Sequence, residues 1–160
     1  MKRLVFLALF IISSAQSVLA VVPGAPSPDF ALHSLDQKST KLSEYRGKVI
    51  LLDFWASWCG PCKESLPWLQ SMQEKYGQRG FQVIAVNVDQ NSDDAKSMLK
   101  ELGVSLLTLL DPAGVTPEMY DLQSMPSSFL IDREGKIRIV HSGFSRSDRE
   151  PLEHAIVSLL

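Results

Sequence analysis

The sequence predicts an α/β fold in which helices cover both faces of a mixed β-sheet. Apolar runs alternate with amphipathic segments along most of the chain, a strand pair with a tight turn follows, and an amphipathic segment comes last. Strands that alternate with helices form parallel pairs, whereas a hairpin adds an antiparallel pair, so the sheet is expected to be mixed. With 160 residues, the chain has room for one compact domain.

The first twenty residues have the three-part pattern of a secretory signal. Two basic residues precede an apolar stretch at 4–12, and the segment ends in small residues up to Ala20. The apolar stretch is shorter than the roughly 20 residues of a membrane-spanning helix. We therefore expect cleavage and a mature domain at 21–160, with an uncleaved membrane anchor as the alternative. Both cysteines lie far downstream, which excludes a lipid-modified cysteine at the signal junction.

The elements of the mature domain are predicted from apolar periodicity and from the residues that bound each segment. Continuous apolar runs are typical of strands buried on both faces, and apolar residues three or four positions apart are typical of helices. Strands are expected at 30–33, 48–55, 81–89, 106–110, 128–131 and 136–141. Helical segments are expected at 42–45, 61–75, 93–102, 116–122 and 147–160.

Local signals place several ends of these elements. Ser92 and Ser147 are the expected N-caps, because a hydroxyl can accept a hydrogen bond from a free backbone N–H of the first turn. Gly103 is expected to stop its helix in a left-handed conformation. We expect Pro67 to kink its helix and a tight turn at 133–135 to join the last two strands.

Charge excludes one class of partner. The chain has 16 Lys and Arg against 18 Asp and Glu, which gives a net charge of −2, and no basic run occurs. Nucleic-acid binding needs clustered basic residues that neutralise phosphates. We therefore expect no nucleic-acid partner, and we expect a monomer.

The chemistry is expected at Cys59 and Cys62, which enclose Gly60 and Pro61 and follow Trp58. A Cys-x-x-Cys pair between a strand and a helix is typical of a redox-active dithiol. Cys59 is expected at the helix N-terminus, where free amides and the helix dipole stabilise a thiolate. Cys62, one turn inside, is expected to be shielded and to resolve the mixed disulfide of Cys59. A proline fits this first turn because no intrahelical N–H bond is needed there.

The cysteine pair has three alternative interpretations, and the sequence disfavours each of them. A zinc site needs four ligands, but the chain has two cysteines and three scattered histidines, so no metal is expected. A purely structural disulfide that closes so short a loop adds little stability. A peroxide-reducing cysteine is disfavoured by the Gly-Pro dipeptide between the thiols and by the tryptophan before them.

Residues 49–63, VILLDFWASWCGPCK, resemble the active-site segment of thioredoxins. The wider chain resembles the TlpA/ResA-like family of exported thioredoxin-fold reductases. Residues 24–30 and 41–48 match that family's N-terminal extension, and 125–136 match its proline loop and last hairpin. The resemblance implies a thioredoxin fold with an N-terminal extension and a central insertion. It also implies thiol–disulfide oxidoreductase activity without a cofactor other than the Cys59–Cys62 disulfide.

The resemblance further implies how a client is held beside the cysteines. Pro126 is expected to be a cis-proline next to the sulfur atoms, and the backbone of Met125 to pair with a bound peptide. Trp58 is expected to shield Cys59 and to offer a flat apolar contact, with Gly60 and Pro61 beside it. The other two tryptophans, Trp55 and Trp68, are expected in the core or at its rim.

Asp53 is a carboxyl group in the middle of an apolar strand, six residues before Cys59. Such a group costs stability unless it has a partner or a function. Its position matches the buried aspartate of thioredoxins, which implies that a carboxyl with a raised pKa accepts the proton of Cys62. The alternative is an edge-of-sheet aspartate bonded to backbone.

One position departs from the family pattern. Many ResA-like members carry a glutamate where this chain has Ser65, and the neighbouring Glu64 cannot replace it, because each helical residue turns by about 100°. This departure argues against a specialised cytochrome-maturation role and leaves the redox chemistry unchanged.

The direction of electron flow is expected to be reducing. Oxidising exported enzymes usually carry a histidine between the cysteines, and a histidine stabilises the thiolate and makes the disulfide a stronger oxidant. We therefore expect a periplasmic reductant of protein disulfides, with apocytochrome c among the candidate clients and a membrane thiol reductase of the DsbD type as electron donor. The alternatives are a disulfide-forming oxidase and a redox-silent peptide-binding adaptor. The adaptor would leave Asp53 and both cysteines without a purpose.

Overall fold

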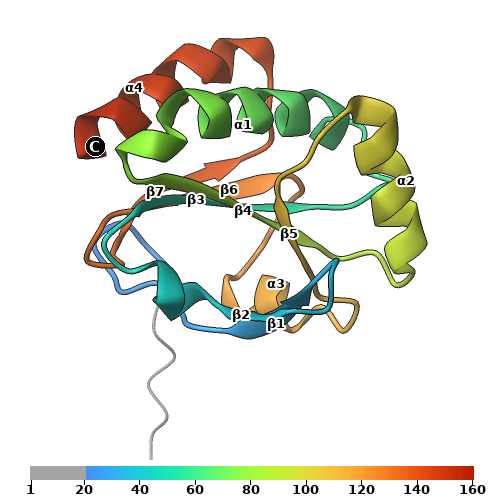
Figure 1. Ribbon diagram of the computed structural model, residues 1–160. Coiled ribbons are helices and arrows are strands. Elements are labelled where there is room, and N and C mark those ends of the chain that lie inside the picture. Colours follow the sequence, from blue (N-terminus) through green and yellow to red (C-terminus); the bar gives the residue numbers. More distant parts are fainter. Residues whose placement is uncertain (1–20) are drawn as a thin grey trace, which may run out of the picture.

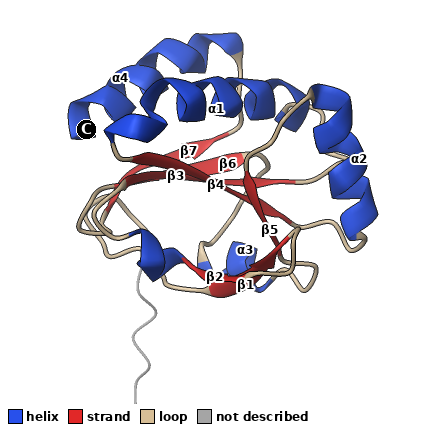
Figure 2. Ribbon diagram, viewed as in Figure 1, coloured by secondary structure: helices blue, strands red, loops and turns tan. Residues whose placement is uncertain are grey.

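The computed structural model describes residues 21–160 and confirms the α/β fold, with a mixed sheet between two covering layers (Figures 1 and 2). The expected signal at 1–20 lies outside the described residues. Within 21–160, no helix combines the length and the apolar character needed to cross a membrane.

The strands and helices follow the expected order along the chain. The strands are β1 (Ala31–Ser34), β2 (Ser39–Lys41), β3 (Val49–Trp55), β4 (Phe81–Asn87), β5 (Leu107–Leu110), β6 (Ser127–Ile131) and β7 (Ile137–Ser142). The α-helices are α1 (Cys62–Tyr76), α2 (Ser92–Leu102), α3 (Val115–Met119) and α4 (Arg149–Leu159). The 3-10 helices are η1 (Leu42–Tyr45), η2 (Gly77–Arg79) and η3 (Arg146–Asp148).

The sheet has the strand order β2-β1-β5-β4-β3-β6-β7. The three strands β3, β4 and β5 are parallel, whereas β6 and β7 add antiparallel pairs on one side and β1 and β2 on the other. Strands β1 and β2 precede β3 in the chain, and α2 and β5 lie between β4 and α3. The central place of β3 and β4 follows from their apolar runs, which can be buried on both sides.

Alternate residues of β3 point to opposite faces of the sheet. Leu51 and Trp55 pack in a core beneath α1, α2 and α4, which we call the α1 face. Leu52 and Phe54 pack on the other side with η1, β1 and the α3 segment, which we call the α3 face. Because Asp53 alternates with Leu51 and Trp55, its side chain belongs to the α1 face, where both cysteines lie.

Two expected N-caps are wrong. Asn91 caps α2 instead of Ser92, since its side-chain oxygen accepts a hydrogen bond from the N–H of Asp93 at 3.0 Å. Ser145 caps η3 instead of Ser147 and forms a reciprocal capping box with Asp148. A cap needs extended backbone outside the helix, and both observed caps have it. Ser92 and Ser147 already lie inside their helical segments.

Other bounds shift for local reasons. The expected helix at 116–122 is the five-residue α3, and Asp121, at φ +48°, adopts a left-handed conformation that ends helical geometry. Gly103 stops α2 in a left-handed conformation, as expected. Helix α1 runs through Pro67 as one element. Strand β2 was not predicted, because Ser39–Lys41 is polar and gains its strand geometry from pairing with β1.

The N-terminal arm is held at one end of the sheet. The N–H of Gly24 donates to the carbonyl of Ile137 at 2.7 Å, and the N–H of Ile137 donates to Ala25 at 2.9 Å. Strand β3 starts beside this end of β6 and β7 and runs away from it toward Trp55 and Cys59. The arm and the cysteine pair, which joins the end of β3 to α1, therefore lie at opposite ends of the sheet. Figure 1 shows the arrangement of β3, β7 and α1.

Candidate active site

Cys59 and Cys62 form a disulfide between the end of β3 and the start of α1, with their Cα atoms 5.4 Å apart. Cys62 is the first residue of the regular helix, so it does not lie one turn inside as expected. Pro61 acts as the cap, and the N–H of Lys63 already donates to the carbonyl of Gly60 at 3.1 Å. Cys59 is 5% exposed and Cys62 is fully buried, so Cys59 is the more accessible residue of the pair.

Asp89 holds the loop that precedes Cys59. Its carboxyl oxygens accept hydrogen bonds from the Ser57 N–H at 3.0 and 3.2 Å and from the Ser57 hydroxyl at 2.9 Å. The side-chain amide of Asn87 donates a further bond at 2.8 Å. The sequence predicts Asp89 only as the last residue of a strand. The available signal was an acidic residue just after a buried parallel strand, at the sheet edge where functional groups gather.

Asp53 is fully buried in the middle of β3. The hydroxyl of Ser128 in β6 donates to its Oδ1 at 2.6 Å, and no group of residues 21–160 donates to Oδ2. Burial raises the pKa of Asp53 to about 7, against the smaller lowering effect of the Ser128 hydrogen bond. The edge-of-sheet alternative is wrong, because β3 lies between β4 and β6 and the bonded partner is a side chain. Burial therefore places the proton equilibrium of this carboxyl near neutral pH.

Trp58 and the segment before β6 border an apolar groove next to the disulfide. The indole-bearing residue Trp58 is 70% exposed. The groove is lined by Trp58, Pro117, Leu122, Gln123, Ser124 and Met125. The Met125–Pro126 peptide bond is cis, and the following Ser127 pairs with Phe54 near the end of β3. The groove and the proline loop thus adjoin residues 57–61 between β3 and α1, which we call the active-site turn. Gly60 and Pro61 are exposed in this turn.

The residues of α1 that follow Cys62 and the other two tryptophans add no buried acid to the site. Glu64 is exposed, whereas Ser65 is buried and its hydroxyl donates to the carbonyl of Cys62 at 3.3 Å. Glu64 therefore does not supply an acid beneath α1, and Asp53 is the buried carboxyl of β3 on that face. Trp55 and Trp68 are buried in the core of the α1 face.

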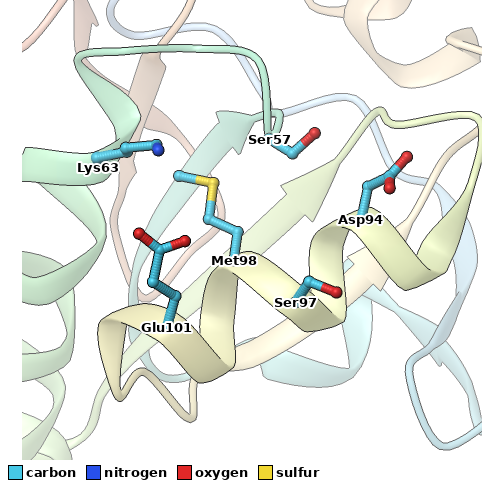
Figure 3. A pocket seen from close by; sticks show the side chains of 6 residues that line it. All are labelled: Ser57, Lys63, Asp94, Ser97, Met98 and Glu101. Atoms are coloured by element: carbon cyan, nitrogen blue, oxygen red, sulfur yellow. The ribbon is translucent and has the colours of Figure 1, made fainter.

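A polar hollow lies beside the active-site turn, between Ser57, the start of α1 and α2 (Figure 3). Lys63 and Glu101 border it from different helices, with Met98 between them (Figure 3). Asp94 and Ser97 complete the lining. Charges of both signs meet here, and residues 21–160 contain no group of three His, Cys, Asp or Glu side chains that could hold a metal ion.

Comparisons with known proteins match nearly the whole described domain. The Redoxin family model matches residues 22–156. Thiol-disulfide oxidoreductase ResA of Geobacillus thermodenitrificans is 31% identical over 124 residues, which cover 78% of this chain and 71% of the relative. ResA of Bacillus subtilis is 32% identical over 124 residues, covering 78% and 69%.

The similarity extends to solved structures. A protein from Chlorobium tepidum that is assigned as thiol:disulfide interchange protein DsbE superposes with a TM-score of 0.83 at 46% identity. The match covers 86% of this chain and 97% of that chain. The lipoprotein thioredoxin Etrx1 of Streptococcus pneumoniae has a TM-score of 0.70 at 34% identity, with 82% and 100% covered.

Proposed function

This chain belongs to the Redoxin family and is a ResA-like thiol–disulfide oxidoreductase, and on that premise we propose that it reduces disulfides of exported proteins. The observation that carries the proposal is the arrangement of the disulfide. Cys59 is the more exposed cysteine, Cys62 is buried behind it, and Asp53 occupies the same face of the sheet.

The reduced protein passes two electrons to its client in two exchanges. The Cys59 thiolate attacks one sulfur of the client disulfide, which forms a mixed disulfide and releases the first client thiolate. The Cys62 thiolate then attacks the sulfur of Cys59, which releases the second client thiolate and leaves the Cys59–Cys62 disulfide. The oxidised protein is the state seen in the structure.

Asp53 serves the second exchange as the proton acceptor for Cys62. A thiol must lose its proton before it attacks a disulfide, and Cys62 is fully buried away from solvent. A general base is most effective when its pKa lies near the working pH, and burial raises the pKa of Asp53 to about 7.

The client lies in the groove beside Trp58. The exposed indole of Trp58 packs on an extended client segment, and the backbone of Met125 pairs with it, while Pro126, Gly60 and Pro61 shape the surface around the sulfur atoms. The apolar lining supports this proposal, because Pro117 and Leu122 continue the apolar surface away from Trp58.

Export and recharging complete the proposal. The pattern at 1–20 directs the chain to the periplasm, and a membrane thiol reductase of the DsbD type supplies electrons to the mature domain at 21–160. The clients are protein disulfides, and apocytochrome c is one candidate among them. The dipeptide Gly60-Pro61, without a histidine, supports the reducing direction.

The test is the reduction potential of the Cys59–Cys62 pair, measured by equilibration of the mature protein with glutathione or dithiothreitol buffers. We expect a value near the roughly −270 mV of thioredoxin. A value toward the roughly −120 mV of a strong oxidant would reverse the proposed direction and indicate disulfide formation.

Trapping tests the roles of the two cysteines. Cys62→Ser removes the resolving thiol and should accumulate mixed disulfides with a reducible protein such as insulin. Cys59→Ser should accumulate none, because the accessible nucleophile is lost. Equal trapping by both variants would contradict the assignment.

A further inference from the structure

The buried carboxyl of Asp53 has one hydrogen-bond donor on its row of the sheet. Asp53 pairs with Ala85 of β4 on one side and with Ser128 of β6 on the other. Residues directly opposite in neighbouring strands present their side chains to the same face. Ala85 has no polar group, so the hydroxyl of Ser128 is the polar neighbour that this row of the sheet supplies.

We propose that Ser128 is a positioning residue for the exchange, because its hydroxyl fixes Oδ1 of Asp53, leaves Oδ2 to take the Cys62 proton, and sets the pH range of that transfer. The inference rests on the proposed role of Asp53 as proton acceptor. In this assignment Ser128 acts through its hydrogen bond to Asp53.

The geometry supports both parts of this role. A hydroxyl that donates to a carboxyl oxygen stabilises the charged form more than the neutral form, and the distance of 2.6 Å is typical of an O–H···O⁻ bond. Both residues are buried, Asp53 completely and Ser128 to 95%, since its exposed fraction is 5%. A single fixed donor on Oδ1 also limits rotation of the carboxyl group, which keeps Oδ2 in one orientation.

The other charged and titratable groups near this row come from β7, η3 and α1. His141 of β7 pairs with Ser128 and lies on the same face, one strand further from Asp53. The Nε2 atom of His141 is 3.8 Å from Oδ2 of Asp148 in η3. At the start of α1, Cys62 is buried, whereas Lys63 is exposed. His141 is therefore the neighbour whose influence must be separated from that of Ser128.

A matched pair of variants isolates the hydroxyl. Ser128→Thr keeps a hydroxyl and Ser128→Val replaces it with a methyl group of nearly the same shape, so both place the same bulk in the site. Ser128→Ala gives a smaller second variant without the hydroxyl. The titration of Asp53 is followed by infrared difference spectroscopy of its carboxyl stretch, with Asp53→Asn as the reference that lacks the band.

We expect Ser128→Val and Ser128→Ala to move the titration midpoint of Asp53 upward by about one pH unit, because a hydrogen bond to the charged form is lost. The pH profile of mixed-disulfide resolution should move by the same amount. Ser128→Thr should keep the titration midpoint of Asp53 at its wild-type value. An unchanged midpoint in both variants without the hydroxyl would overturn the inference.

Two controls separate this result from its neighbours. His141→Gln keeps Ser128 and should leave the Asp53 midpoint in place, and a shift as large as that of Ser128→Val would overturn the assignment to Ser128. A resolution profile that Asp53→Asn leaves unchanged would instead refute the proton-acceptor role. The infrared midpoint needs no activity, so a failure of the proposed function and a failure of the Ser128 bond give different results.

Discussion

Two buried aspartates at neighbouring strands of the sheet have opposite surroundings. Asp53 lies inside β3 and receives one hydrogen bond, from Ser128. Asp89 follows β4 and receives bonds from the Ser57 backbone, the Ser57 hydroxyl and Asn87. Both side chains are withdrawn from solvent, yet only Asp53 retains an oxygen without a donor among residues 21–160.

The comparison shows how the number of donors decides what a buried carboxyl group can do. Burial destabilises the charged form of a carboxyl group that has few hydrogen-bond donors. Its pKa therefore rises, and the group can exchange a proton near neutral pH. A carboxyl with several donors becomes a fixed acceptor that joins backbone segments. In this fold Asp53 is suited to chemistry, and Asp89 is suited to holding Ser57 and the turn that leads to Cys59.

The largest effect is expected from Asp53→Asn on the second exchange. The amide cannot accept the Cys62 proton, so the rate of mixed-disulfide resolution at neutral pH should fall by a factor of about 10² to 10⁴. Stopped-flow release of client thiol measures this rate. Asp89→Asn is the matched control, and an equal loss in both variants would remove the functional distinction between the two aspartates.

The same substitution should change how stability depends on pH. Asp53 has a pKa of about 7 in the folded protein and an ordinary value of 3.8, so the folded chain binds more protons between these pH values. Stability conferred by this site is therefore present below about pH 4 and is lost as the pH rises toward 7. The shift corresponds to roughly 4 kcal/mol in total.

Urea unfolding of the oxidised proteins at pH 4 and pH 8 measures this linkage. Relative to wild type, Asp53→Asn should gain stability at pH 8 over pH 4, because it has no charge to bury. Parallel stability curves for the two proteins would contradict the raised pKa.

A smaller loss of stability is expected from Asp89→Asn. The side-chain N–H₂ of the new asparagine cannot accept the bond from Asn87, so one buried polar group loses its partner. This costs about 1 to 3 kcal/mol of unfolding free energy, which urea unfolding measures. The exposed Asp94→Asn is the control and should stay within about 0.5 kcal/mol of wild type.

The smallest effect is expected from Ser57→Ala. This variant loses the hydroxyl bond to Asp89 at 2.9 Å and keeps the backbone N–H that donates to both carboxyl oxygens. The free energy of unfolding should therefore fall by about 1 kcal/mol. The infrared midpoint of Asp53 should not move. A midpoint shift in Ser57→Ala would show that the two aspartate regions are coupled.

The sequence predicts the central elements because their signals are local. The apolar runs of β3 and β4 can be buried on both faces, and Gly103 ends α2 through its own backbone preference. Strand β2 is not predictable in this way, since its three polar residues become a strand only through pairing with β1. The third helix is misjudged because a left-handed conformation at Asp121 ends it early.

The residues of the candidate site also differ in whether a local sequence signal identifies them. The Cys-x-x-Cys pair and Asp53 were identified because each is chemically unusual at its position in the sequence. Ser128 and Asp89 were missed because their partners are 75 and 32 residues away in the chain. The register of β6 against β3 brings Ser128 to Asp53, and the parallel pairing of β3 and β4 brings Asp89 to Ser57.

The N-terminal arm and the cysteine pair mark two opposite ends of the domain. The arm leaves the fold at the start of β7, and the cysteine pair lies beyond the far end of β3. The seven residues of β3 alone separate these points by about 23 Å at 3.3 Å per residue. A tether attached ahead of residue 21, such as an uncleaved leader in a bilayer, would hold the arm near the lipid and turn Cys59 outward. The active-site turn would then face the aqueous space away from the membrane. A membrane-embedded electron donor would have to reach it with a domain that extends into that space.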